Sequence, residues 1–480
     1  MAIGSYTPAG KDFTQRVLGQ ENYLDIQTNG WAQQYLPDLV EKEAEVFGKR
    51  TISGFLSQVS AEEAMSADQV IWSEQGRLHL AYEGTITSAA ASTVEIAKTM
   101  DGVAQTADHG INVGDMVLVA GGGQTITARV SSAPDADASV ILLPYGYAHM
   151  SDAGFVDGDD TIKILVFGSE YAKGTVNKTR SNKPVFNVYD NKPIIIKDMF
   201  EVSGSDAAQI GWVEVSGEEG QNGYYWYLKA AGDTRARFTD YLEMVCVEAE
   251  KNVAASNIAL NAGAAVDADD QCGTEGLFKA ITSRGHTSSG VSGVNAATDL
   301  AEFDAMLAAF DENGAIEENM MFVNRATALA IDDMLASMNS YGAGGTSYGV
   351  FDNSEAMALN LGFSGFRRGS YDFYKSDWKY LNDKQTRGGI NAAATGGEAI
   401  RGVVVPAGVS SVYDQSLGRN MKRPFLHVRY RASNLESRKF KTWVTGSVGA
   451  VTSDLDAMTM NFLSERCMVT QGANNFCLLN

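Results

Sequence analysis

The chain has 480 residues, and its 38 Lys and Arg residues against 59 Asp and Glu residues give a formal net charge of −21. So acidic a chain is not expected to bind nucleic acid sequence-specifically or to attach to anionic lipid, because both depend on cations that meet phosphates. Four cysteines without a CxxC pair exclude a disulfide scaffold, and no apolar run approaches the ~20 residues of a membrane span.

The first 75 residues predict an extended arm with two short helical patches. One patch begins at Pro37-Asp38 and the other at Ser60. Neither is long enough to build a core alone. The N-terminal segment has no apolar core of a signal peptide, so we expect synthesis in a cytoplasm.

From about residue 77 to 170 the apolar residues recur with a period of two, as in Leu78, Leu80 and Tyr82. Turn dipeptides such as Asp101-Gly102 separate the runs. This pattern predicts a small antiparallel β-domain, either a barrel or a sandwich. The glycine-rich stretch 120–124 lies between two strands, which favours a hairpin turn over a phosphate-binding loop.

A basic stretch follows between residues 173 and 197. It contains six cations and one aspartate, Asp190, with Asp198 directly after it, which is unusual in so acidic a chain. We expect it to meet an acidic partner. The cations are Lys173, Lys178, Arg180, Lys183, Lys192 and Lys197.

Residues 223–252 predict one long helix of ~45 Å. Four aromatic residues, Tyr224 to Tyr227 with Trp226 among them, stand at its beginning. The expected apolar face contains Phe238, Tyr241, Leu242, Val245 and Ala249, and the polar remainder contains Arg235, Asp240, Glu243, Glu248 and Glu250.

A mixed α/β region is expected up to about residue 400. It contains a helix over 299–314, a strand over 319–324 and a helix over 325–338, followed by a glycine-rich surface loop at 342–349. Beyond residue 400 the pattern is β-rich, with one more helix expected near 453–467.

No group of residues predicts catalysis. The five histidines are scattered, with His286 expected in a loop and His427 on a strand surface. The acidic stretch after Asp311 lacks the glycine position of a calcium loop and predicts a helix end capped by Asn313-Gly314. We therefore predict no catalytic, metal-binding or cofactor-binding residue, and a protein that is not an enzyme.

Several strings resemble the major capsid proteins of tailed double-stranded DNA bacteriophages, a fold shared by encapsulins, and among them most the crAss-like lineage. They are "GINVGDMVLVAGGGQTITARVSSA", "VYDNKPIIIKDMFEVSGSDAAQIGW", "EFDAMLAAFDENGAIEENMMFVNRATALAIDDM" and the tail "LSERCMVTQGANNFCLLN". The order of the parts resembles that family as well: an arm, a β-rich excursion, a long helix, an α/β part and a β-rich return.

The resemblance implies an α+β chain with the phage major capsid fold. Its parts would be an N-terminal arm, an extended loop that carries an inserted antiparallel β-domain, a spine helix, a peripheral domain and an axial domain. The corresponding ranges are 1–75 for the arm, 76–200 for the loop with its insertion at about 80–170, 201–262 with 401–480 for the peripheral domain, and 263–400 for the axial domain.

The function implied is that of a structural virion protein, made in the host cytoplasm, which assembles with itself into hexamers and pentamers of an icosahedral shell around double-stranded DNA. Portal, decoration or scaffold proteins are the other expected partners, without a membrane or a cofactor. Two alternatives stay open: another virion component of the tail or baseplate, and a carbohydrate-active hydrolase with a β accessory domain, whose paired carboxylates a sequence does not reveal.

In such a shell an extended loop lies over the spine helix of the neighbouring subunit. We therefore expect an inter-subunit contact between the basic stretch and the acidic side of the helix. Its members are Lys173, Lys178, Arg180, Lys183, Asp240, Glu243, Glu248 and Glu250, with Trp226 and Tyr227 as aromatic contacts.

Overall fold

A computed structural model describes most of the chain from residue 51 onwards. The described residues are 51–76, 79, 81–104, 109–134, 138–176, 178, 181–182, 186–205, 214–216, 222–252, 273–314, 316–339, 365–393, 399–407, 409–414, 419–448 and 451–480. The arm before residue 51 and the loop at 342–349 lie outside them. Helices and strands are both abundant, which confirms the α+β prediction.

The period-two region forms a closed antiparallel barrel, so the barrel alternative is the one observed. The strand order is β3-β4-β7-β6-β5-β8, with residues 120–124 in the β5–β6 turn as predicted. The strands are β3 (Ala81–Ser88), β4 (Thr93–Thr99), β5 (Asp115–Gly121), β6 (Gln124–Ser132), β7 (Ser139–Pro144) and β8 (Ile162–Ser169). Alternate side chains fill a core that belongs to the barrel alone, with Tyr82, Ile96, Val119, Leu142 and Ile164 among them.

A two-stranded ribbon carries this barrel. Strand β2 (Val70–Gln75) pairs antiparallel with β9 (Phe186–Asn191), and Gln75 lies opposite Phe186 where the chain leaves for the barrel and returns. The two ends of the barrel segment therefore lie together.

The prediction of a helix that begins at Ser60 is wrong. Residues after the short helix α1 (Phe55–Val59) form strand β1 (Ala61–Met65), which pairs in parallel with β20 (Leu426–Arg431). The two adjacent glutamates are good helix formers, but their carboxylates pair with cations on opposite faces of the strand. Glu63 lies 2.7 Å from Arg429, and Glu62 pairs with Lys439 and Arg466. These tertiary contacts override the local preference.

The long helix is α3 (Tyr225–Glu248), which lies along a sheet built from distant segments. That sheet joins β10 (Ile194–Ser203), β22 (Ala457–Thr470) and β21 (Lys441–Gly446). Phe238 and Leu242 pack on Phe462, whereas Tyr241 of the expected apolar face is exposed.

The prediction of a helix over 453–467 is also wrong, because residues 457–470 form the central strand β22. It hydrogen-bonds with β10 on one side and with β20 and β21 on the other, so the sheet decides its conformation. His427, expected on a strand surface, is buried within β20 for the same reason.

A second sheet has six strands in the order β13-β23-β17-β14-β16-β15. Helices α5 and α6 pack on one face through Phe303, Phe310 and Ile331, and the other face joins α1, α3 and α4 through Phe278, Phe322 and Trp378. The elements are α4 (Leu277–Arg284), β13 (His286–Ser288), α5 (Ala296–Asn313), β14 (Glu318–Val323), α6 (Arg325–Asn339), β15 (Gly365–Arg368), β16 (Tyr371–Asp377), α7 (Lys379–Asn382), α8 (Arg387–Ala393), β17 (Gly402–Pro406) and β23 (Cys477–Leu479).

Two smaller predictions are confirmed in this part of the chain. Helix α5 ends at Asn313, and Gly314 adopts the left-handed conformation with φ 61° that a helix end of this type requires. Cys246, Cys467 and Cys477 are free and buried, and burial raises the pKa of each thiol to about 12. Cys272 lies outside the described residues.

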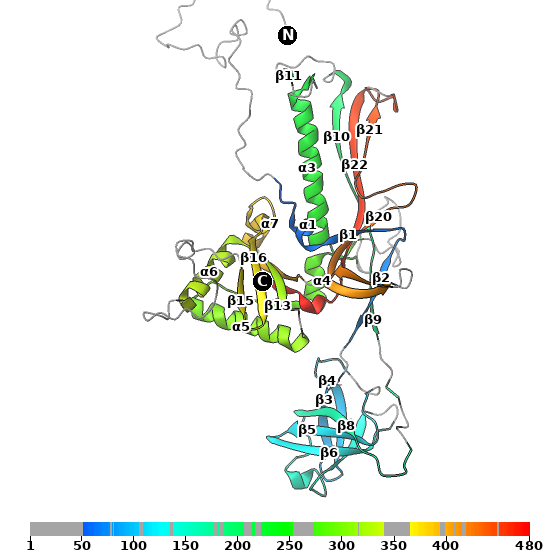
Figure 1. The fold of residues 1–480 in the computed structure, drawn as a ribbon, viewed down its shortest axis with the longest axis vertical. Coiled ribbons are helices and arrows are strands. Elements are labelled where there is room, and N and C mark those ends of the chain that lie inside the picture. Colours follow the sequence, from blue (N-terminus) through cyan, green and yellow to red (C-terminus); the bar gives the residue numbers. More distant parts are fainter. Residues whose placement is uncertain are drawn as a thin grey trace, which may run out of the picture.

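Two hairpins complete the described elements. They are β11 (Glu214–Ser216) with β12 (Asn222–Tyr224), and β18 (Val409–Asp414) with β19 (Arg419–Pro424). Figure 1 shows an elongated molecule in which α3 and its sheet lie at one end and the barrel at the other, joined by the ribbon. No helix in the described ranges is long and apolar enough to span a membrane.

Because the barrel has its own core and its ends meet at the ribbon, we expect it to be removable. Replacing residues 76–185 by Asn-Gly would join Gln75 to Phe186 through a two-residue turn. The free energy of unfolding of the remaining body should differ from that of the body in the full chain by no more than about 0.5 kcal/mol. Circular dichroism during urea unfolding measures it.

The control for this deletion is truncation before Ser453, which removes β22 and β23 with buried Phe462, Met468 and Phe476. Each large apolar side chain contributes ~1.5–3 kcal/mol, so this shorter chain should have no cooperative transition. Loss of cooperative unfolding in the barrel deletion itself would contradict the independence of the two parts.

Candidate functional site: the base of the ribbon

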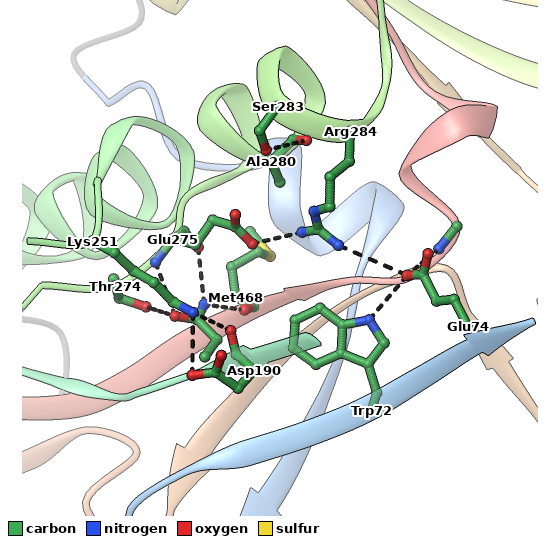
Figure 2. Close-up of polar contacts among 12 residues, drawn as sticks. Trp72, Glu74, Asp190, Lys251, Thr274, Glu275, Ala280, Ser283, Arg284 and Met468 are labelled. Atoms are coloured by element: carbon green, nitrogen blue, oxygen red, sulfur yellow. Dashed lines mark hydrogen bonds and ion pairs between the residues drawn. The ribbon is translucent and has the colours of Figure 1, made fainter. Parts of the chain in front are cut away.

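The ribbon meets the body at one dense group of polar side chains, shown in Figure 2. Strand β2 contributes Trp72 and Glu74, and β9 contributes Tyr189, Asp190 and Asn191. The body contributes residues from α4, from the turn before α4, from the end of α3 and from the turn after β22. We call this group the ribbon base.

Arg284 at the end of α4 lies at the centre of the ribbon base. Its guanidinium carbon is 4.5 Å from the ring centroid of Tyr189 and 5.6 Å from that of Trp72. Its Nη2 lies 2.6 Å from the carboxylate of Glu275, and its Nη1 lies 3.8 Å from that of Glu74. A planar cation can stack on rings and bind carboxylates at once, so Arg284 holds both strands of the ribbon against the body.

Glu74 extends the same attachment to the end of the long strand β22. Its Oε1 accepts hydrogen bonds from the indole nitrogen of Trp72 at 3.0 Å and from the backbone N–H of Gly472 at 2.9 Å. One carboxylate therefore orients the tryptophan within β2 and ties the strand to a turn almost 400 residues away in sequence.

Asn191 at the end of β9 is fully buried and uses both ends of its amide. Its Nδ2 donates to the carbonyl oxygens of Met468 at 2.6 Å and Glu275 at 3.0 Å. Its Oδ1 accepts from the backbone N–H of Glu275 at 2.9 Å and from the hydroxyl of Thr274 at 3.1 Å. A buried amide with this many partners specifies one position, because every displaced bond would leave a polar group unsatisfied.

Asp190 completes the ribbon base from the next position. Its carboxylate lies 3.2 Å from the ammonium of Lys251 and accepts from Gln69 at 3.0 Å. Desolvation raises the pKa of Asp190, but the hydrogen bonds from Gln69 and Lys251 outweigh it and leave the pKa lowered. The ribbon base therefore fixes the position in which the ribbon leaves the body.

The acidic side of α3 is used within the chain. Asp240 Oδ1 accepts the backbone N–H groups of Ile52 and Ser53 at 3.1 and 3.0 Å, and the two oxygens of Glu243 accept those of Gly54 and Phe55 at 2.8 and 2.9 Å. The two carboxylates thus cap the start of α1 and hold the segment that arrives from the N-terminal arm. We call them the arm clasp.

The other members of the predicted inter-subunit contact are dispersed. Glu248 accepts from the hydroxyl of Tyr380 at 2.7 Å and pairs with Arg387 at 2.9 Å, while Glu250 lies 2.5 Å from Lys279. Burial and the neighbouring Glu248 raise the pKa of Tyr380.

The basic stretch is only partly described. Lys178 lies 2.5 Å from Asp115 of the barrel, and Lys173 is exposed. Arg180, Lys183 and the side chains of Trp226 and Tyr227 lie outside the described residues. The contact between subunits stays a prediction.

Sequence reasoning missed the ribbon base. Its members come from five separated segments, and only Pro193, which cannot donate a hydrogen bond to a neighbouring strand, marks the place where β9 ends. The described ranges contain no group of three or more His, Cys, Asp or Glu side chains that could hold a metal ion.

Comparison with known proteins gives similarities in structure only. No family model and no curated protein matches the chain. A capsid structure of the cyanophage P-SCSP1u is 9% identical with a TM-score of 0.42, covering 95% of this chain and 98% of that chain. A chain of Mycobacterium phage Ogopogo is 11% identical with a TM-score of 0.41 over 95% and 98%, and one of the mature capsid of bacteriophage PhiM1 is 8% identical with a TM-score of 0.38 over 92% and 91%. All three TM-scores are below 0.5.

The buried amide of Asn191 can be tested by a near-isosteric change. Asn191→Asp removes two donors and places a carboxylate against the carbonyl oxygens of Met468 and Glu275. The free energy of unfolding of the body should fall by about 2–4 kcal/mol. Urea unfolding monitored by tryptophan fluorescence measures it.

The matched control is Asn187→Asp, an exposed position on the same strand, where the change should stay within about 0.5 kcal/mol. Equal effects of the two substitutions would show that the amide of Asn191 has no special role.

The arm clasp predicts a pH dependence. Burial raises the pKa of Glu243 above its ordinary 4.5, although backbone hydrogen bonds from Gly54 and Phe55 oppose the shift. Because the folded pKa exceeds the unfolded one, the stabilisation that follows from this shift is complete below pH 4.5 and is lost as pH rises through the raised pKa.

Glu243→Gln should remove this pH dependence from urea midpoints that are measured in a series of buffers from pH 4.5 upwards. The control is Glu250→Gln, which removes an exposed carboxylate outside the arm clasp and should leave the pH profile unchanged. A profile that is the same in all three proteins would rule out a titrating Glu243.

Proposed function

We propose that the protein is a structural subunit of the icosahedral shell of a tailed double-stranded DNA bacteriophage, without enzymatic activity. The observation that carries the proposal is the order and arrangement of parts in this chain. A paired two-stranded excursion carries a barrel, a 24-residue helix lies along a sheet, a separate α/β unit follows, and the C-terminal strands return to both sheets. This is the arrangement expected from the resemblance in sequence.

Exposed apolar surface supports a protein that neighbours complete. Ile71 and Val188 share one face of the ribbon, and Ile195 and Met199 share the face of β10 that points away from α3. Each of the four is more than half exposed. A two-stranded ribbon is marginally stable by itself in water, so apolar side chains along it favour burial against another surface.

In finer detail, we assign the ribbon and barrel to the extended loop with its insertion, and α3 to the spine helix. The sheet of β10, β22 and β21 belongs to the peripheral domain. The axial domain is the six-stranded sheet with α5 and α6. Strands β17 and β23 pair within this sheet, so on this assignment the 401–480 segment serves both domains.

The net charge of −21 suits an inner wall that faces packaged DNA. A negative wall does not bind phosphates strongly, so the genome can move during packaging and ejection. Portal, decoration and scaffold proteins are the proposed partners besides further copies of the chain.

Assembly tests the proposal. The purified chain, expressed alone and with any scaffold its source supplies, should form hollow particles of many copies that negative-stain electron microscopy reveals. A chain that stays a small oligomer under both conditions would contradict the shell and favour an enzyme. Open tubes or rings in place of closed particles would favour a tail or baseplate component.

Among the described residues, Lys173 on the loop and Glu250, two residues after the end of α3, are exposed members of the proposed contact between the loop and a neighbouring α3, although Glu250 also pairs with Lys279. Exposed pairs contribute only about 0.2–1 kcal/mol each, but the contact recurs in every subunit. Lys173→Glu should therefore lower the yield of particles, more so at low salt, whereas Lys384→Glu, an exposed cation outside the loop, should not. Equal yields of particles from the two variants would contradict the proposed contact.

A further inference from the structure

The outer surface of the barrel has two unlike halves. On β3 and β4 the outward residues are polar, with Glu83, Thr85, Glu95 and Lys98 among them, and Glu83 pairs with Lys98 at 2.9 Å. An antiparallel sheet that faces water has this pattern. The other half, on β8, β5, β6 and β7, departs from it.

Large apolar side chains project from that second half. Leu165 and Phe167 of β8 are 41% and 52% exposed, and Leu143 of β7 and the adjacent Tyr145 are 47% and 44% exposed. Their inward neighbours already fill the barrel core, so these residues are not needed for folding.

The strand registers place these side chains in one continuous band. Leu165 lies opposite Leu118 on β5, and Leu118 lies opposite Thr127 on β6. Tyr145 donates its backbone N–H to the carbonyl of Thr127, which closes the row across four strands. Met116, Arg129 and Leu143 form the next row beside Phe167. We call these two rows the barrel band.

The band is electrically balanced in a chain that is otherwise strongly acidic. The cation of its second row is Arg129, whose Nε donates to the backbone carbonyl of Glu170 at 3.1 Å. The carboxylate of Glu170 accepts from the hydroxyl of Tyr145, so one cation and one anion stand side by side. Under a twofold axis, Arg129 of each copy can approach Glu170 of the other.

The band faces away from any cover within the described chain. The barrel stands at the far end of the ribbon, and the body lies beyond the ribbon base (Figure 1). The four exposed apolar side chains present about 400 Å², as large as the largest apolar patch of a typical monomer.

We infer that the barrel band is a contact between two copies of this chain, packed barrel against barrel about a twofold axis. Two such bands would bury about 800 Å² in total, which is below the ~1,200 Å² of a stable complex between free partners. A contact of this size holds only between copies already fixed near one another, so the inference rests on the proposed shell, where neighbouring copies raise the effective concentration.

A second copy fits this band better than a foreign partner of opposite charge does. The chain carries a net charge of −21, and copies repel each other except where their facing surfaces are neutral. The band supplies such a surface, because one cation, Arg129, and one anion, Glu170, lie at it, and each can meet the opposite charge of a second copy. Two antiparallel faces can also pack sheet on sheet with little rearrangement.

A cysteine at the centre of the band tests the contact in the full chain. Thr127 is exposed on an inner strand of the band. Near a twofold axis, a cysteine at this position lies close to the same cysteine of the second copy. A disulfide requires Cα atoms within about 7 Å, so treatment of assembled protein with a mild oxidant should give a covalent dimer on a non-reducing gel. Thr87→Cys, on the polar half of the same barrel, is the matched control and should give about tenfold less dimer.

Substitutions within the band separate a specific contact from chance collision. Adding Leu165→Asp and Phe167→Asp to the Thr127→Cys chain should reduce the dimer about tenfold, because two carboxylates would be buried without partners. Val156→Asp, an exposed apolar position outside the band, should leave it unchanged. Circular dichroism confirms that each variant keeps its folded barrel.

The outcomes distinguish the inference from the shell. Three results would overturn the barrel contact and leave the proposed shell unaffected. The Thr127→Cys chain could form particles without a covalent dimer, the Thr87→Cys and Thr127→Cys chains could cross-link equally, or a cross-link could form only to a different protein. Dimer formation in a concentrated chain that never forms particles would contradict the shell and would overturn the inference that the contact forms only between copies held near one another. Absence of both would overturn both.

Discussion

The amide of Asn191 is the constraint on which the arrangement of the molecule depends. It binds the end of β9, the turn before α4 and the strand β22 in one buried network, so three segments more than 80 residues apart have fixed relative positions. Arg284 and Glu74 add a second attachment on β2. A ribbon of two strands has no sheet of its own to orient it, and these side chains replace that support. The direction of the ribbon is set at these contacts.

Local patterns predicted the parts of the chain whose structure is decided locally. The alternation of Tyr82 with its polar neighbours marks a barrel strand, and the Asn313-Gly314 pair marks the end of α5 because only the left-handed conformation closes that turn. Both signals lie within a few residues, and nothing distant competes with them. The period-two pattern therefore holds for the described barrel strands, apart from bulges such as the one between Glu83 and Gly84 in β3.

Predictions failed where distant partners decide the conformation. Residues 453–467 contain good helix formers, yet β10 on one side and β21 on the other hold them as the strand β22. The segment after Ser60 failed for the same reason, since Arg429 draws Glu63 into a parallel pair with β20. The ribbon base could not be predicted at all, because its hydrogen bonds join residues that share no local motif. Asp240 and Glu243 read as surface charges in the sequence, although backbone N–H groups of residues 52–55 occupy them.

The distribution of charge connects these observations. Where carboxylates are buried in the described chain, they have backbone or cationic partners, as Glu243 has in the arm clasp and Asp115 has in Lys178. The exposed carboxylates of the described chain add negative charge to the surface, which keeps separate chains apart. Against that background, neutral apolar areas such as the barrel band and the outer face of β10 are the places where two copies can meet at least electrostatic cost. Each area is small, so an assembly built from them would need many weak contacts at fixed positions, and the rigid ribbon base supplies those positions.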